Sequence, residues 1–293
     1  MEQQPLVSVV VITYNSSATV LETLESIKKQ TYQNVELIVS DDSSTDDTQS
    51  LVLQWLKKNE NKFSFKRAIL TSTPTNGGPA VNCNHGIRNT GGEWIKLIAG
   101  DDLLLPECIE KNVKFVLSNP SAKIVFSKMS CFGDDNKATL VQSSVNWNYR
   151  KLSTQQQFVL MLLSNRVSAP SALINRQVWC DLGEFDENIP FLEDWPFWIK
   201  AMKAGISISF MDEFTICYRT HDSLSLSKTP SKRFLDSYDR AKHYAHKCQR
   251  EYSILLRLYS LVLENVDNAI AQKLFLALNP FYWYVRYLNF LMK

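Results

Sequence analysis

The chain has 293 residues, of which 45% are apolar and 21% are charged, enough to bury a large core without disulfide or metal staples. Its formal net charge is +2, from 32 basic and 30 acidic side chains, which excludes the broad basic footprint of a nucleic-acid-binding protein. Six widely spaced cysteines form no CxxC pair, so the sequence indicates neither a zinc site nor a small disulfide scaffold. We expect free thiols in a reducing cytoplasm.

The N-terminal segment MEQQPLVSVVVITYN has no basic n-region and no small-residue cleavage site, so we expect no secretory signal. No uninterrupted apolar run reaches the length of a membrane span. Both features favour a cytoplasmic location.

The first hundred residues alternate between apolar strands and amphipathic helices. The run VSVVVIT at 7–13 is almost wholly apolar and β-branched, which is typical of a strand buried on both faces of a parallel sheet. Val20, Leu24 and Ile27 then recur at helical spacing. Further along the chain we expect strands at VELIVSDD, 68–71 and 93–99, and helices that begin at Asp46 and near residue 80. This β-α-β-α-β order predicts a parallel sheet with right-handed crossovers.

The second half of the chain gives weaker signals. Residues 123–130 predict another strand, and 206–219 alternate in strand fashion. From about residue 231 the pattern turns helical, and Pro280 is expected to break or kink that helix.

Three pairs of carboxylates each follow an apolar or aromatic segment. They are Asp41 with Asp42, Asp101 with Asp102, and Glu193 with Asp194. Any single pair is more often a helix cap or a turn. Three pairs are harder to explain that way, because adjacent carboxylates repel each other unless a cation or donor lies between them. At the carboxyl ends of strands, where open α/β sheets bind ligands, they predict a phosphate-bearing substrate with Mn²⁺ or Mg²⁺.

Three segments spanning about residues 7–220 resemble the family 2 inverting glycosyltransferases. They are VSVVVITYNSSATVLETLESIKKQTYQNVELIVSDDSSTDDT, NGGPAVNCNHGIRNTGGEWIKLIAGDD and FLEDWPFWIKAMKAG, in the family's order and spacing. The resemblance implies an α/β fold of GT-A type, with a mostly parallel central sheet flanked by helices. It also implies a catalytic domain at 1–230, with a nucleotide-sugar half at about 1–105 and an acceptor half at about 106–230. A helical C-terminal extension at 231–293 follows.

The resemblance assigns several residues to the donor nucleotide. Tyr14 is expected to stack on the base, which a flat ring does well, and Asp42 to hydrogen-bond it. The other expected donor-binding residues are Asn15, Asp41, Asn84 and Asp101. For Asp46 two roles stay open, a contact with the donor and a helix cap. Relatives often carry Arg just before the residue that corresponds to Asn84, where Cys83 stands here, so UDP is the expected nucleotide without being fixed by the sequence.

The resemblance also assigns the metal and the chemistry. Gly100-Asp101-Asp102 resembles the family's DxD-type site with Gly in the first position, so Asp102 is expected to bind the metal. His221, in YRTHDSLSLS, is the second expected metal ligand. Asp194 corresponds to the general base, with Glu193 beside it, and would deprotonate the acceptor hydroxyl in a single inverting displacement.

Trp195, next to this pair, is open between stacking on the acceptor sugar and packing in the core. Arg219 is a weaker candidate for a contact with phosphate oxygens. Both assignments depend on where the fold places the side chains, which spacing does not report.

The resemblance implies transfer of a sugar from a nucleotide diphosphate donor to a saccharide or lipid-linked saccharide, in bacterial surface polysaccharide or glycoconjugate synthesis. Two alternatives stay open. A nucleotidyltransferase would usually have a Gly-rich basic loop after the first strand, where TYNSSAT stands here. A non-catalytic nucleotide-sugar-binding module is disfavoured by intact Asp102 and Asp194.

The C-terminal tail, LFLALNPFYWYVRYLNFLMK, interleaves aromatic rings with Arg286 and Lys293. Such a segment suits a membrane interface, and a lipid-linked acceptor would then place the protein at the inner face of the plasma membrane. Packing of the tail on the catalytic domain or on a second subunit is the equal alternative.

Overall fold

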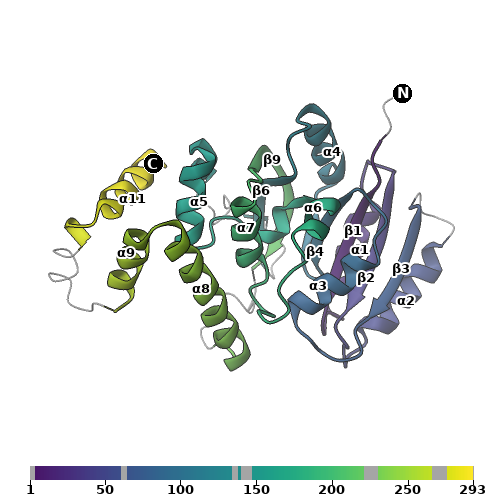
Figure 1. The fold of residues 1–293 in the computed structure, drawn as a ribbon. Coiled ribbons are helices and arrows are strands. Elements are labelled where there is room, and N and C mark those ends of the chain that lie inside the picture. Colours follow the sequence, from purple (N-terminus) through teal and green to yellow (C-terminus); the bar gives the residue numbers. More distant parts are fainter. Residues whose placement is uncertain are drawn as a thin grey trace.

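The computed structural model describes residues 4–60, 65–133, 138–139, 147–220, 230–265 and 276–292. The strands in these ranges are β1 (Val7–Thr13), β2 (Val35–Asp41), β3 (Arg67–Ser72), β4 (Trp94–Ala99), β5 (Leu103–Leu104), β6 (Ile124–Phe132), β7 (Ala138–Thr139), β8 (Leu173–Asn175) and β9 (Ile208–Arg219). They form one sheet in the order β3-β2-β1-β4-β8-β6-β9-β5, with β7 paired to β6 (Figure 1).

Helices cover both faces of this sheet. They are α1 (Val20–Lys28), α2 (Thr48–Asn59), α3 (Pro79–Arg88), α4 (Cys108–Ser118), α5 (Thr154–Leu163), α6 (Arg176–Asp181), α7 (Asp194–Lys203), α8 (Lys232–Tyr252), α9 (Ile254–Asn265) and α11 (Pro280–Leu291), with the 3-10 turns η1 (Trp147–Lys151) and η2 (Ala169–Ser171). Alternate residues of β1 enter two different cores: Val10 packs with α3, α6 and α7, whereas Val9 and Val11 pack with α1, α2 and α4. The prediction of a strand buried on both faces is confirmed.

The parallel sheet is confirmed for β3, β2, β1 and β4, which pair parallel throughout. Beyond β4 the sheet is mixed, because β8 runs antiparallel to both β4 and β6, and β5 runs antiparallel to β9. β6 and β9 pair parallel. Strands from before and after residue 105 belong to the same sheet. The division of the catalytic domain into two halves at about this residue therefore stays a prediction.

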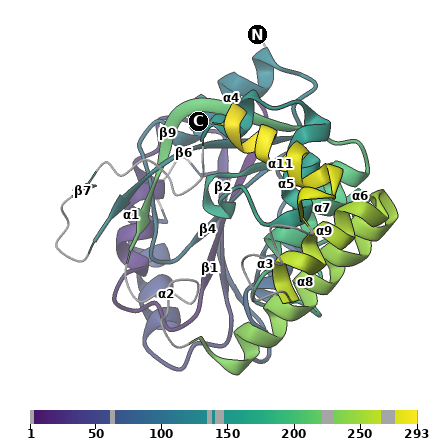
Figure 2. The ribbon, with the colours of Figure 1, turned by 90° about the vertical axis from the view of Figure 1, so that its left-hand side faces the viewer.

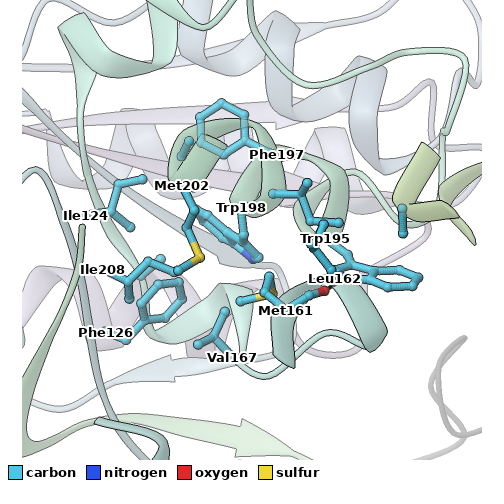
Figure 3. Close-up of a cluster of buried hydrophobic side chains, with 14 of the residues drawn as sticks. Ile124, Phe126, Met161, Leu162, Val167, Trp195, Phe197, Trp198, Met202 and Ile208 are labelled. Atoms are coloured by element: carbon cyan, nitrogen blue, oxygen red, sulfur yellow. Dashed lines mark hydrogen bonds between the residues drawn. The ribbon is translucent and has the colours of Figure 1, made fainter. Parts of the chain in front are cut away.

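An aromatic core fixes α7 on the second half of the sheet (Figure 3). The ring of Phe126 on β6 meets the indole of Trp198 edge to face, with centroids 5.0 Å apart. Phe197 also meets Trp198 edge to face, with centroids 5.4 Å apart, and Met202 lies beside them. Because offset and edge-to-face aromatic pairs add to the burial energy, α7 and the acidic residues at its start are held firmly.

The expected C-terminal helices are confirmed in the described residues, as α8, α9 and α11. Ser231 caps α8 by accepting from the Phe234 N–H at 3.2 Å. α11 begins at Pro280, with Asn279 as its cap, so the predicted break at this proline is confirmed and reflects the fit of proline to the first turn. Figure 1 shows α8, α9 and α11 at the end of the molecule opposite β3, and Figure 2 looks onto that end. No helix in the described ranges is long and apolar enough to cross a membrane.

Candidate active site

A cavity of about 450 Å³ opens where β1, β2 and β4 end. Its wall includes Tyr14, Asp42, Asn76, Asn82, Asp101 and Arg233. This is the carboxyl edge of the parallel strands, where ligands bind in open α/β sheets. The sequence predicted this edge, and three of its expected donor-binding residues lie in the wall.

The loop after β1 presents Tyr14 at the cavity. Its side chain is half exposed, so one face of the ring is available to a ligand. Asn15 has a φ of 50°, a left-handed conformation that asparagine tolerates. Its amide oxygen accepts from the Thr45 N–H at 2.9 Å, and its own N–H donates to Ser44 Oγ at 2.8 Å. Asn15 therefore ties the loop after β1 to the loop after β2 and is not part of the cavity wall.

The two carboxylates after β2 differ in their surroundings. Asp42 lines the cavity and accepts from the N–H groups of Gly77 and Gly78, at 3.0 and 2.7 Å, and from Thr73 Oγ1 at 2.8 Å. It therefore orders the 73–78 loop against the cavity. Gly78 has a φ of +91°, which a residue with a side chain adopts only at a cost.

Asp41 is fully buried beneath this loop. Its carboxylate accepts from Thr13 Oγ1 at 2.8 Å, from the N–H and hydroxyl of Ser44, and from Gln49 Nε2 at 2.6 Å. Through these hydrogen bonds Asp41 connects the end of β1 to the loop after β2 and to α2. Its role as a ribose contact stays a prediction.

Asp46 lies in the turn just before α2, next to the N-cap residue Asp47. It accepts from the Ser17 N–H at 3.1 Å and from the Thr48 N–H at 3.0 Å. Burial alone would raise the pKa of Asp46, but the hydrogen bonds from Thr48 and Ser17 lower it to about 2. Asp46 thus holds the turn before α2 to the loop after β1, and a contact with the donor stays a prediction.

Asn84, an expected donor-binding residue, lies away from the cavity. It is fully buried and absent from the wall, so its role in donor binding stays a prediction. Its amide donates to the Phe185 carbonyl and to Glu187 Oε1, each at 3.0 Å, and accepts from the Phe185 N–H at 3.1 Å. The physical reason is helical phase, since residues two apart on a helix point about 200° apart. The wall residue is Asn82, whose Nδ2 donates to the Thr13 carbonyl at 3.1 Å.

Asn82 was missed by the sequence analysis. Its Oδ1 is buried and has no hydrogen-bond partner among the described residues. The sequence feature that could have indicated Asn82 is the position of α3, which begins directly after Gly77 and Gly78. The first turn of this helix therefore lies near the strand ends. Cys83, where relatives often carry Arg, lies fully buried in the core on the other side of the helix.

Asp101 lines the cavity, and Asp102 lies buried behind it. Asp102 Oδ1 accepts from the Arg219 N–H at 2.8 Å, whereas Oδ2 has no hydrogen-bond partner among the described residues. Burial, and then the charge of Asp101, raises the pKa of Asp102 well above its usual range. A Cβ at Gly100 would lie 2.8 Å from Thr13 Cγ2, which explains glycine at the first position of this motif.

Arg219 holds the Asp101-Asp102 turn in place. Its Nε donates to the Asp101 carbonyl at 2.9 Å, and its Nη2 lies 2.5 Å from Glu22 Oε2. The guanidinium also stacks 4.4 Å from the centroid of Phe132. These contacts make Arg219 a support for the turn and leave it nearly buried, so the weaker prediction of a phosphate contact gains no support.

A divalent cation fits the free oxygen of Asp102. A buried carboxylate oxygen with no partner is costly unless a cation or donor is supplied. Mg²⁺ and similar ions are often held by one or two carboxylates, with substrate phosphates and water completing the shell. No cluster of three or more His, Cys, Asp or Glu that could hold a metal occurs in the described ranges, and His221 lies outside them. The metal site therefore stays a prediction.

Glu193 and Asp194 begin α7, just after the wall residue Phe191. Asp194 Oδ2 accepts from Asn165 Nδ2 and Oδ1 from the Trp195 N–H, both at 2.7 Å. Burial, and then the charge of Asp194, raises the pKa of Glu193 to about 8. Burial also raises the pKa of Asp194, against the hydrogen bonds that it accepts. This is the environment of a carboxylate that can take up a proton near neutral pH.

Glu193 and Asp194 are not wall residues of the cavity. Burial raises the pKa of the Cys83 thiol on α3, and the charges of Glu193, Asp194 and Asp42 raise it further. The acidic pair and the wall residue Asp42 therefore act on the same buried thiol.

Trp195 packs in the core, one of the two roles left open for it. Its side chain is only 5% exposed, and its indole N–H donates to the Met161 carbonyl at 2.8 Å. Figure 3 shows it within the hydrophobic cluster next to Leu162. The Trp195 indole fills space between α7 and α5, and a contact with the acceptor sugar stays a prediction.

The fold of this chain is shared with solved protein structures. It is similar to crystal structures of TarS from S. aureus: for TarS residues 1–349 in complex with UDP-GlcNAc, the TM-score is 0.62 and the sequences are 22% identical, over 94% of this chain and 82% of that chain. At that identity the likeness shows the GT-A fold of glycosyltransferases. Residues 8–182 match the model of glycosyl transferase family 2. The chain belongs to glycosyl transferase family 2.

Similar sequences carry the same description. The chain is 27% identical over 75% of its length to an uncharacterized glycosyltransferase of Rickettsia typhi, covering 65% of that protein. It is 32% identical over 54% of its length to one of Haemophilus influenzae, covering 60% of it. It is 26% identical over 89% of its length to one of Methanocaldococcus jannaschii, covering 88% of it. The chain thus spans less than two thirds of the first two relatives.

Proposed function

We propose that this glycosyltransferase transfers a sugar from a nucleoside diphosphate donor, with UDP the first choice, to an acceptor hydroxyl with inversion. The observation that carries the proposal is the cavity at the strand ends, with Asp42 and Asp101 in its wall and the unpartnered Asp102 Oδ2 behind it. TarS was solved in complex with UDP-GlcNAc and with UDP, and that fold-level likeness supports UDP.

In this proposal the donor base binds between the loop after β1 and the loop after β2. The half-exposed ring of Tyr14 offers a flat apolar face to a base. Asp42 keeps acceptor capacity for a base N–H beyond the three donors that already reach it.

Asp102 is the proposed protein ligand of Mn²⁺ or Mg²⁺. The bound cation would supply charge neutralisation for the departing diphosphate. Arg219 then serves to fix the Asp101-Asp102 turn through its contacts with both residues.

Asp194 is the proposed general base. It accepts the proton of the acceptor hydroxyl while that oxygen forms a bond to the anomeric carbon. The bond from this carbon to the diphosphate oxygen breaks on the opposite face, and the leaving oxygen keeps the electron pair. A pKa raised by burial makes the Asp194 carboxylate a better proton acceptor than an ordinary one. Asn165 holds it in one orientation.

The substitution Asp194→Asn tests this assignment. We expect turnover of UDP-sugars, measured as UDP release, to fall by about 10²–10⁴-fold, while UDP binding by calorimetry stays unchanged. Asp181→Asn, at an exposed carboxylate of α6, is the matched control and should keep both. Wild-type protein that binds nucleotide sugars without turnover would favour the non-catalytic module. Pyrophosphate release from UTP would favour the nucleotidyltransferase.

The proposal extends to a lipid-linked saccharide acceptor at the inner face of the plasma membrane, in bacterial surface polysaccharide synthesis. α11 buries Val285 and Leu288 and leaves Trp283, Tyr287 and Phe290 each more than half exposed. An amphipathic helix with outward aromatic rings suits a membrane interface. Changing the three exposed rings to Ser should abolish co-sedimentation with anionic vesicles, whereas Leu53→Ser on α2 should not. Equal binding of the two variants would remove the membrane contact.

A further inference from the structure

The start of α8 reaches the donor cavity. Ser231 and Arg233 lie in its wall, although the family match ends at residue 182 and the sequence analysis assigned 231–293 to an extension. A residue from this helix therefore faces the same space as Tyr14 and Asp101, which come from the N-terminal strands.

Arg233 is held there by two contacts. Its Nη1 donates to Asn76 Oδ1 at 3.0 Å, and its guanidinium carbon lies 5.0 Å from the centroid of Phe191. Asn76 and Phe191 are themselves wall residues. A cation over an aromatic face is attracted to the ring, so the two contacts together restrain the guanidinium at the wall, and it has further N–H donors besides the one on Asn76.

Arg233 differs in charge from the acidic residues of the cavity wall. Among the described wall residues, Arg233 supplies the positive charge, facing the carboxylates of Asp42 and Asp101. The position on α3 where relatives often carry Arg holds Cys83, which is fully buried. A cavity for a nucleoside diphosphate needs cationic donors, and a guanidinium binds phosphate oxygens through paired N–H groups.

We infer that Arg233 binds a phosphate of the donor nucleotide, so that α8 completes the donor site from outside the segment matched by the family. The inference rests on the proposed function, because it takes the cavity as a nucleotide site. Asn76 and Phe191 then act as positioning residues that hold the guanidinium toward the ligand.

Calorimetric titration of UDP and of uridine, each with Mn²⁺ present, tests the inference. We expect Arg233→Ala to weaken UDP binding by about tenfold and uridine binding by less than about twofold, because only UDP carries the phosphates. Arg233→Lys keeps the charge without the planar fork and should fall between wild type and Arg233→Ala. Arg240→Ala is the matched control: this exposed arginine of the same helix donates to the Asn188 carbonyl and is absent from the wall.

Two results would overturn the inference. One is Arg233→Ala binding UDP as tightly as wild type, and the other is an equal loss for UDP and uridine. Circular dichroism melts of each variant verify that it is folded. Wild-type protein that binds none of UDP, GDP or dTDP would instead contradict the proposed function itself, so the two failures are distinguishable.

Discussion

Replacing Glu193 by Gln tests the electrostatics at the start of α7. Burial, followed by the charge of Asp194, raises the pKa of Glu193 from 4.5 to about 8. Between these values the folded chain holds a proton that the unfolded chain has released. The stability that this proton binding contributes is fully present below about pH 4.5 and is lost as the pH rises through about 8. Glutamine copies the protonated form, so Glu193→Gln should not lose it.

The size of the effect follows from the same pKa. At ~1.36 kcal/mol for each pH unit between 4.5 and about 8, the ceiling is about 5 kcal/mol. We expect about 1–3 kcal/mol, because the Glu193 side chain keeps some contact with solvent and shares its titration with Asp194. Wild type should therefore be less stable than Glu193→Gln at alkaline pH by this amount.

Urea unfolding, followed by far-ultraviolet circular dichroism with EDTA present, measures the free energy of unfolding of both proteins at a series of pH values. The gap between wild type and Glu193→Gln should widen from below about pH 4.5 to about 8. A gap that stays constant with pH would refute the reasoning, since it would mean that Glu193 is ionised in the folded chain at neutral pH. Asp181→Asn should track wild type throughout.

Three further predictions follow. Asn165→Ala removes the 2.7 Å hydrogen bond to Asp194, so the pKa of Asp194 should rise and the acid limb of the pH profile of donor turnover should move up by up to about 1 pH unit; an unmoved limb would separate Asn165 from the base. Asp102→Asn should make UDP binding by calorimetry equal with and without Mn²⁺, and a retained Mn²⁺ effect would place the ion elsewhere. Gly86→Ala puts a Cβ 2.6 Å from Val10 Cγ1, so it should lower the free energy of unfolding by about 1–3 kcal/mol in urea titration; unchanged stability would contradict the close packing of α3 on β1.

The sequence predicted the N-terminal half of the fold well because its signals are local. The β-branched run at 7–13 forms β1, and the weaker run at 68–71 lies within β3. β5 and β8 have two and three residues, too short for any periodicity, and their antiparallel pairing with β9, β4 and β6 depends on partners far along the chain.

Strand ends made some site residues easy to place from the sequence. Tyr14, Asp42 and Asp101 line the cavity because the end of a strand fixes where the next residue lies. Asn84 lies away from the wall, because the sequence did not fix the phase of α3. Arg233 could not be expected at all, since α8 reaches the cavity only through tertiary packing.

A crystal structure with UDP and Mn²⁺ bound would show whether the cavity at the strand ends holds the donor. We expect the base against Tyr14 and Asp42, the ion on Asp102 and the phosphates within reach of Arg233. Nucleotide density elsewhere on the protein, with the cavity at the strand ends holding only water, would contradict it.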